Sequence, residues 1–395
     1  MSGPARAALI WDPVFTTYRF GPDHPFNPRR LQLTVSLMEE LGLLSGDGLR
    51  VVPPRQATDE ELLLVHDPEY VDAVRRLGAG DAAPGEARRW GLGTEDTPVF
   101  PGMHEATAAV VGGTLVAAEL VMGGEVSRAF ALAGGLHHAH RAQASGFCVY
   151  DDLAVAIAWM RARHGARVLY IDVDAHHGDG VQGIFYRDPD VLTFSMHESG
   201  RYLFPGTGFV DELGEGEGYG FSLNLPVEPF TEDESWIGLY ADFLPEAAAA
   251  FRPDVILLQA GCDAHALDPL THLRCTTRMY EEVVRVTCEV ADAYCGGRVV
   301  ATGGGGYAIW QAVPRAWTLV WAALSGQSVP DEIPEAWLSR WQPESPVPLP
   351  TRLRDTPDAY APAPRRAEIE AANRRSVETL RRTALPLLRG YSLGF

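Results

Sequence analysis

The sequence contains no lysine, so every basic residue apart from histidine is an arginine. The protein therefore cannot be regulated by acetylation of its own lysine side chains. Cysteine is also scarce, because the chain has only five and none of them forms a Cys-x-x-Cys pair. An odd, unpaired set argues against a disulfide framework and against a structural zinc ribbon. We expect reduced thiols in a cytosolic enzyme.

Long apolar runs and positive charge are poorly represented as well. We find no apolar run that approaches the roughly 18–20 residues needed to cross a bilayer. Residues 1–6 lack the basic region and apolar stretch of a secretory signal. We therefore expect a cytoplasmic protein without a membrane partner. The formal net charge of −19 argues against a nucleic-acid partner and is compatible with cationic substrates.

Regular alternation of strand and helix patterns is what the sequence does contain. Short β-branched runs are expected as strands at 7–11, 129–132, 167–173, 191–196, 221–225, 254–259 and 298–302. Helical patterns lie at 28–44, 104–122, 151–163, 233–251, 276–294 and 310–324. This alternation predicts an α/β fold with three layers, in which helices cover both faces of a mostly parallel sheet.

The composition changes after residue 328. Nine prolines fall within 329–364, which predicts an irregular strap, and 365–389 is strongly helical and rich in arginine. We expect a catalytic domain at 1–328, followed at 329–395 by a strap and a C-terminal helix that pack on or extend the same domain.

Four polar clusters stand where predicted strands end. They are G-G-L-H-H-A at 134–139, Y-I-D-V-D-A-H-H-G-D-G at 170–180, Q-A-G-C-D at 259–263 and T-G-G-G-G-Y at 302–307. Ligands of open α/β sheets bind beyond the carboxyl ends of the strands. Each cluster alone fits a cap, a turn or a solvated loop, but structural accidents have no reason to gather at four strand ends. The clusters therefore indicate one active site.

The second cluster predicts a metal site. Side chains alternate along a strand, so Asp172, Asp174 and His176 should project from one face. Three ionisable groups at the end of so apolar a strand would be costly without a cation. Carboxylates and an imidazole suit Zn²⁺ or Fe²⁺, and a catalytic site would take a further ligand from another strand. Asp263 is the best candidate for that ligand.

Taken together, these motifs resemble the histone deacetylase superfamily, and most closely its bacterial acetoin-utilisation branch. The resemblance covers nearly the whole chain. Its remaining motifs are H-P-x-x-P-x-R at 24–30, W-G-L-G-T-E-D at 90–96, A-S-G-F-C at 144–148, S-M-H at 195–197, F-P-G-T-G at 204–208 and D-P-L at 268–270. It implies an arginase/deacetylase-like fold and a metal-dependent amidohydrolase.

The resemblance also implies roles for individual residues. Asp174, His176 and Asp263 would hold the metal, which is Zn²⁺ or, as an alternative, Fe²⁺. His137 would pair with Asp172, and His138 with Asp179, as buried imidazole–carboxylate dyads. His138 would be the general base and acid, and His137 its electrostatic partner. Tyr307 would be the electrophilic hydroxyl. Phe147 and Phe204 would wall a narrow tunnel for an alkyl chain, with Gly146 and Leu270 beside it.

Two further kinds of site are implied by the same resemblance. Arg30 would line an internal cavity through which acetate leaves. Structural K⁺ or Na⁺ ions would bind at two sets of residues, which are Asp172, Ser195 and Met196 in the first and Phe185, Asp188, Val191 and Phe221 in the second.

The function expected from these motifs is removal of the acetyl group from acetyl-lysine, with an acetylated protein as substrate. An acetylpolyamine or another small acetylated amine is the alternative, because these molecules present the same acetylated amine to the tunnel residues as acetyl-lysine does. An arginase-like ureohydrolase with two Mn²⁺ would need an aspartate where Gly178 stands. An inactive acetyl-amine binding module would lack a ligand, histidine or tyrosine, and none is lacking. The sequence does not indicate an oligomeric state.

Overall fold

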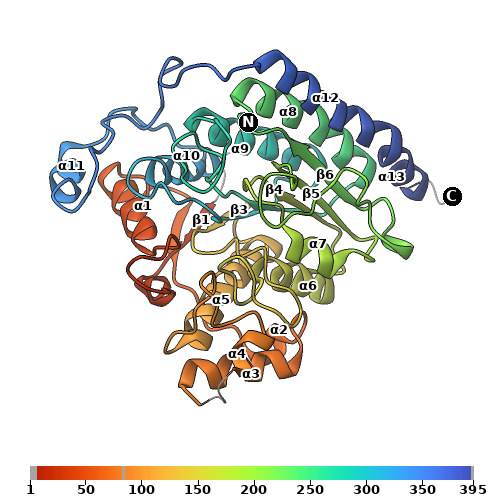
Figure 1. Cartoon of the computed structure of the whole chain (residues 1–395), viewed down its shortest axis with the longest axis horizontal. Helices are drawn as coiled ribbons and strands as arrows, with labels where there is room; N and C mark the ends of the chain where they lie inside the picture. The colour runs from red at the N-terminus through yellow and green to blue at the C-terminus, as the bar shows by residue number, and fades with distance from the viewer. Residues whose placement is uncertain (1–6, 82–84, 393–395) are drawn as a thin grey trace.

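A single parallel sheet is the centre of the computed structural model, which describes residues 7–81 and 85–392 (Figure 1). Its strands run in the order β2-β1-β3-β8-β7-β4-β5-β6. Their bounds are β1 Ala7–Ile10, β2 Leu49–Val52, β3 Arg128–Ala131, β4 Val168–Asp172, β5 Val191–Glu198, β6 Ser222–Val227, β7 Val255–Gln259 and β8 Val299–Thr302. The predicted three-layer α/β fold is confirmed.

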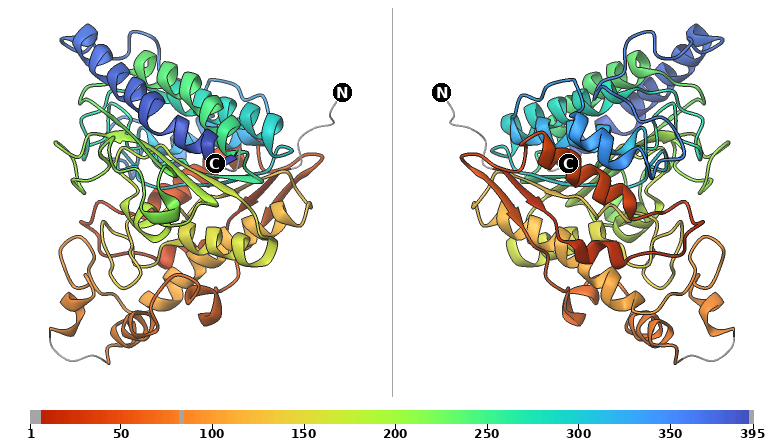
Figure 2. Two further views of the ribbon diagram at one scale, coloured as in Figure 1. Left: turned by 90° about the vertical axis from the view of Figure 1, so that its right-hand side faces the viewer. Right: turned by 90° about the vertical axis from the view of Figure 1, so that its left-hand side faces the viewer.

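Helices cover both faces of this sheet, as Figure 2 shows edge-on. On one face lie α5 (Met103–Met122) and α6 (Asp152–His164), and on the other α1 (Arg29–Glu40), α8 (Asp233–Phe251), α9 (Thr277–Tyr294) and α10 (Val313–Ser325). Further helices before the C-terminal part are α2 (Asp59–Leu62), α3 (Pro68–Ala79), α4 (Glu86–Arg89), α7 (Asp179–Phe185) and α11 (Glu335–Trp341). Among the described residues, seven of the eight strands lie within a few residues of the expected segments. All six expected helical segments before residue 328 are helices, whereas α3 was not expected. The central strands β4 and β7 are buried along their whole length, as in parallel sheets covered on both faces.

The expectation that no segment approaches membrane-spanning length needs correction. Helix α5 has 20 residues and is apolar enough to cross a membrane by length and composition alone. In the structure 83% of its apolar window is buried inside the protein, so the helix belongs to the core. Residues 1–6, on which the expected absence of a secretory signal depends, lie outside the described residues.

The chain after residue 328 is more structured than a strap followed by one helix. The proline-rich part contains α11, whose Trp337 and Trp341 are buried beside Leu33 and Leu37 of α1. The expected single helix at 365–389 is two helices, α12 (Arg366–Thr383) and α13 (Leu385–Ser392). Pro386 stands at the start of α13, where its missing N–H is tolerated. Helix α12 packs against β6 and α8.

Candidate active site

The strand order explains why the four polar clusters form one site. The strands that precede them, β3, β8, β7 and β4, are consecutive neighbours in the sheet. Because all four run parallel, their carboxyl ends lie along the same edge. The topology therefore brings together residues from 134–139, 170–180, 259–263 and 302–307, as the sequence predicts.

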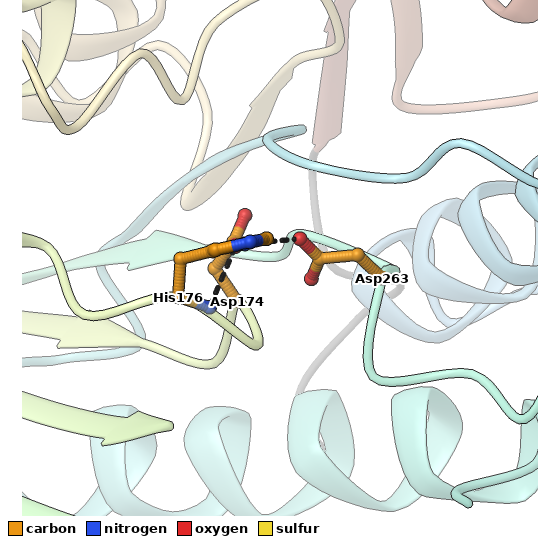
Figure 3. Close-up of side chains that lie close together, drawn as sticks. All are labelled: Asp174, His176 and Asp263. Carbon is orange, nitrogen blue, oxygen red and sulfur yellow. Dashed lines mark hydrogen bonds and ion pairs between the residues drawn. The ribbon is translucent and has the colours of Figure 1, made fainter. Parts of the chain in front are cut away.

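Asp174, His176 and Asp263 converge at this edge, as Figure 3 shows. One possible ligand atom from each lies within 4.8 Å of the others. His176 Nδ1 is 2.9 Å from Asp263 Oδ2 and 3.1 Å from Asp174 Oδ1. The expectation of simple strand alternation was wrong here, because β4 ends at Asp172. Asp174 and His176 lie in the loop that follows, so a turn brings them to the site.

The two carboxylates of this triad are held by two backbone amides and by the side chain of Gln259. Asp174 Oδ2 accepts hydrogen bonds from the Gly305 amide (2.7 Å) and from Gln259 Nε2 (2.8 Å). Asp263 Oδ1 accepts one from the Ala175 amide (2.7 Å). A Cβ at Gly305 would overlap the Asp263 carboxylate, which gives a steric reason for glycine in the loop after β8. These contacts leave the oxygens near His176 pointing toward a common centre.

The charges of the triad fit a cation. Burial, together with the neighbouring Asp174 carboxylate, raises the pKa of Asp263 to about 8. The two carboxylates overcome burial and raise the pKa of His176 well above its ordinary value. Two buried carboxylates so close to one another repel unless a positive charge lies between them. Two oxygens and one imidazole nitrogen are a ligand set typical of Zn²⁺ and Fe²⁺.

Two histidine–aspartate pairs lie beside the triad. His137 Nδ1 is 2.7 Å from Asp172 Oδ2, and His138 Nδ1 is 2.7 Å from Asp179 Oδ1. The two imidazole rings have centroids 4.0 Å apart. Because a carboxylate accepts from each Nδ1–H, the Nε2 atom of each ring is left to exchange protons. The structure thus assembles both predicted dyads.

The two histidines differ in electrostatics. Burial disfavours the charged form of His137, but Asp172 and Asp174 outweigh it and raise its pKa to about 10. Burial and the neighbouring His137 charge lower the pKa of His138 to about 4, against the attraction of Asp179. Neighbouring imidazoles titrate as a coupled pair, so the difference in pKa between His137 and His138 is a property of the two residues together. His138 is therefore the neutral member and the better proton acceptor at neutral pH.

The residues predicted for the tunnel surround His138 and Tyr307. The Phe204 ring is 5.0 Å from the His138 ring, and the Phe147 ring is 5.8 Å from that of Tyr307. A Cβ at Gly146, where φ is +49°, would collide with the His138 ring. Leu270 is 36% exposed and Phe204 is 46% exposed, so both reach the surface. The aromatic rings therefore form the approach to the dyads.

Tyr307 is positioned by Asp268, a residue without a role predicted from the sequence. Its backbone amide donates to Asp268 Oδ2 (2.8 Å), and Asp268 Oδ1 accepts from the Leu270 amide (3.0 Å). One buried carboxylate thus joins the Tyr307 loop to the rim, and the D-P-L motif at 268–270 was the signal for it. Burial, followed by the charges of Asp263 and Asp174, raises the pKa of the Tyr307 hydroxyl. That hydroxyl remains a hydrogen-bond donor at neutral pH.

Tyr170, Gln259 and Tyr18 also support the site. The hydroxyl of Tyr170 donates to Asp172 and so shares that carboxylate with His137. The Tyr18 hydroxyl donates to the Phe147 carbonyl (2.6 Å) and thereby fixes the strained backbone of Phe147, where φ is +69°. Tyr170 and Gln259 lie in the strand-end clusters, whereas nothing in the sequence points to Tyr18.

Arg30 lies buried behind the Tyr307 loop. Its Nη1 donates to the Gly304 carbonyl (2.8 Å) and the Gly306 carbonyl (3.2 Å), and its guanidinium stacks over Phe26. Burial lowers its pKa, while Tyr307, Cys262 and Asp174 act in the opposite direction. Its Nε has no acceptor within the described part of the chain. A buried cation with a free donor fits the anion cavity predicted for it.

The two predicted monovalent-cation sets are also brought together. Asp172 and Ser195 are in register across β4 and β5, and Met196 follows. In the second set, the Asp188 amide donates to the Phe185 carbonyl (2.9 Å), and the Val191 amide donates to the Asp188 carbonyl (3.3 Å). Phe221 adjoins them through its carbonyl, which accepts from the Thr193 amide (3.0 Å). Binding of K⁺ or Na⁺ at either set stays a prediction.

Comparison with known proteins agrees with this geometry. Residues 24–324 match the histone deacetylase domain. The chain is 51% identical to the acetoin utilization protein AcuC of Bacillus subtilis over 372 residues, which are 94% of this chain and 95% of the relative. It is 43% identical to AcuC of Staphylococcus xylosus over 91% of this chain and 94% of that one.

Solved structures show the same relationship. The crystal structure of an HDAC homolog from Aquifex aeolicus superposes with a TM-score of 0.83 at 31% identity, and covers 94% of this chain and all of its own. An HDAC homolog complexed with SAHA matches equally well at 30% identity, covering 95% of this chain and all of its own. The chain therefore belongs to the histone deacetylase family of hydrolases.

Proposed function

We propose that this hydrolase removes the acetyl group from acetyl-lysine in polypeptides and releases acetate and the free amine. The histone deacetylase family is metal-dependent, and Zn²⁺ is the metal that we propose for the triad. The observation that carries the proposal is the convergence of the triad, the neutral His138 and the Tyr307 hydroxyl behind an aromatic approach. Phe147 and Phe204 suit an unbranched methylene chain that carries a neutral acetylated amine.

Each residue has a defined part in this chemistry. A divalent cation held by Asp174, His176 and Asp263 would polarise the acetyl carbonyl and acidify the attacking water. His138 Nε2 takes the proton of that water and later gives it to the leaving amine, which would otherwise depart as a strong base. Asp179 fixes the tautomer and orientation of His138. His137 acts as an electrostatic partner.

Tyr307→Phe should lower kcat by about 10²–10³ and leave substrate binding largely unchanged. The substitution removes only the hydroxyl that donates to the developing oxyanion, and keeps the ring that packs against Phe147. Steady-state kinetics with a blocked acetyl-lysine substrate measure the effect. A variant within a few-fold of the parent would show that Tyr307 serves only as a wall of the approach.

A small acetylated amine is the second candidate substrate, because the same head group would fit the site. Glu198, a buried carboxylate that contacts His272 two residues after Leu270, argues against a polyamine. It is buried, and it accepts hydrogen bonds from the backbone amide (2.9 Å) of His272 and lies 2.7 Å from Nδ1 of that residue. A carboxylate already satisfied by a neighbour offers little to a distant ammonium group.

The kcat/KM for an acetyl-lysine peptide with uncharged flanks should therefore exceed that for acetylputrescine. The apolar approach fits a neutral methylene chain, whereas the free ammonium of acetylputrescine would have to lose water at the aromatic rim. Both substrates are assayed under one set of conditions, with a chelator control. Equal or better turnover of acetylputrescine would move the assignment to polyamine metabolism.

A further inference from the structure

A groove lies between helix α12 and the loops at the entrance of the site. Its volume is about 730 Å³. One wall belongs to α12. The other is formed by loop residues around 202, 228–230 and 274. The α12 wall includes Ile369, Ala372 and Arg375, and the loop wall includes Tyr202, Phe230 and Arg274. We call this cavity and its extension the α12 groove.

The extension is a second cavity of about 530 Å³ that shares Glu228, Ala372 and Arg375 with the first. It adds Arg201 and reaches Thr379 of α12. The lining along the helix thus runs from Arg365 to Thr379, which is about 21 Å at about 1.5 Å per residue. An extended peptide covers that length with about six residues.

The α12 groove adjoins the loops that carry the entrance residues Phe204 and Leu270. Tyr202 stands two residues before Phe204 in the same loop. On the other side, the Phe230 amide donates to the His272 carbonyl (2.9 Å), and His272 is two residues after Leu270. Tyr202 is 54% exposed and Phe230 is 46% exposed. Two exposed aromatic rings of the groove, Tyr202 and Phe230, therefore lie on segments that are joined to the entrance loops.

The charge of the α12 groove differs from that of the whole chain. Acidic residues outnumber basic ones by 52 to 33 overall, but four arginines and three carboxylates line the groove. Arg365 is ion-paired with Glu368. The guanidinium groups of Arg201 and Arg375 have no hydrogen-bond or ion-pair partner within residues 7–81 and 85–392. The net negative charge that suggested cationic substrates therefore does not extend to this surface.

We propose that the α12 groove binds the polypeptide segment that flanks the acetyl-lysine of a substrate, and that it favours acidic side chains there. Resting on the proposed deacetylase function, this inference identifies the substrate class as extended, acidic polypeptide. Tyr202 and Phe230 contact the chain nearest the acetyl-lysine, since aromatic rings at a rim bury area at small entropic cost. Arg201, Arg274 and Arg375 then pair with carboxylates of the segment, for which guanidinium is well suited.

The test uses three blocked substrates, which are acetyl-lysine itself and two 13-residue peptides with a central acetyl-lysine. Aspartate and glutamate flank it in one peptide and arginine in the other. We compare the parent with the double variant Arg201→Glu/Arg375→Glu. Arg382→Glu is the matched control, because this exposed arginine lies on α12 outside the groove. Fluorescence anisotropy of the labelled peptides measures binding independently of turnover.

We expect the parent to favour the acidic peptide over acetyl-lysine alone and over the arginine peptide. The double variant should lose about 3- to 30-fold of this preference, as two reversed charge contacts imply, whereas Arg382→Glu should retain it. Equal preference in the parent and the double variant would overturn the proposal, as would preference for the arginine peptide. So would a dimer that dissociates in the double variant, because a second copy would then fill the groove.

Failure of the deacetylase proposal has a separate signature. The acidic peptide would bind and the double variant would weaken its binding, but no acetyl-lysine substrate would be hydrolysed. The groove assignment would then stand as a peptide-binding surface. If acetyl-lysine alone is hydrolysed and the peptide flanks bring no gain, the deacetylase function is supported and the proposed role of the α12 groove is refuted.

Discussion

His138→Ala should lower kcat by about 10²–10⁴, and His137→Ala should be less damaging. His138 is the imidazole whose pKa, held near 4 by burial and by the neighbouring His137, leaves it neutral and able to accept a proton. His137 is held protonated by Asp172 and Asp174 and acts mainly through its charge. Rate constants for both variants, measured with a blocked acetyl-lysine substrate, test this order.

His140→Ala is a matched control for this comparison. The His140 Nε2 atom lies 3.4 Å from Asp179 Oδ2, so it contacts the same carboxylate as His138 but from a more exposed position. We expect this control to retain activity within a few-fold. If His137→Ala proved more damaging than His138→Ala, the roles of general base and electrostatic partner would have to be exchanged.

Much of the fold could be predicted because its strands carry strong local patterns. Strands such as β4 and β7 are short apolar runs followed directly by polar clusters, and the helices between them are long. Strand β2 (Leu49–Val52) was missed because it lies at the sheet edge, where its residues are not buried and carry no continuous apolar signal. Helix α3 was missed although its amphipathic pattern follows Pro68, which is a good helix start.

The candidate site could be predicted at the level of clusters but not of geometry. Side chains from neighbouring parallel strands meet at one edge whatever the loops do, so the convergence of Asp174 and Asp263 followed from topology. The residue at which β4 ends could not be predicted from topology. The sequence predicts that Asp172, Asp174 and His176 project from one face of a strand. In the structure the strand ends at Asp172, and its carboxylate contacts His137 and Tyr170 instead.

Contacts between segments far apart in the chain could not be predicted from the sequence. Asp355, in the proline-rich strap, lies with Oδ2 2.9 Å from His265 Nε2 and accepts a hydrogen bond from Arg315 Nη1 (2.8 Å). His265 stands two residues after Asp263, so the strap is attached to the loop that carries part of the metal site. No local pattern marks such a pair, because partners 90 residues apart are matched only in the folded chain.

Removal of the bound metal should abolish activity and lower the melting temperature. Without a cation, Asp174 and Asp263 remain as neighbouring carboxylates, and burial together with the charge of Asp174 raises the pKa of Asp263 to about 8. A raised carboxyl pKa means that protons occupy the site below that pH. The rise in melting temperature on adding Zn²⁺ to chelator-treated protein should therefore be large at pH 8 and smaller at pH 6, because protons compete for Asp263.

Asp263→Asn separates this explanation from a general loss of structure. The variant should neither bind Zn²⁺ nor hydrolyse acetyl-lysine, yet its metal-free form at pH 8 should be at least as stable as the metal-free parent, because one of two repelling charges is gone. The exposed Asp358→Asn is the matched control and should behave like the parent in both assays. Metal content is measured on each preparation. Full activity in a sample with verified metal loss would refute the metal assignment, and a Zn²⁺ response retained by Asp263→Asn would place the ion elsewhere in the chain.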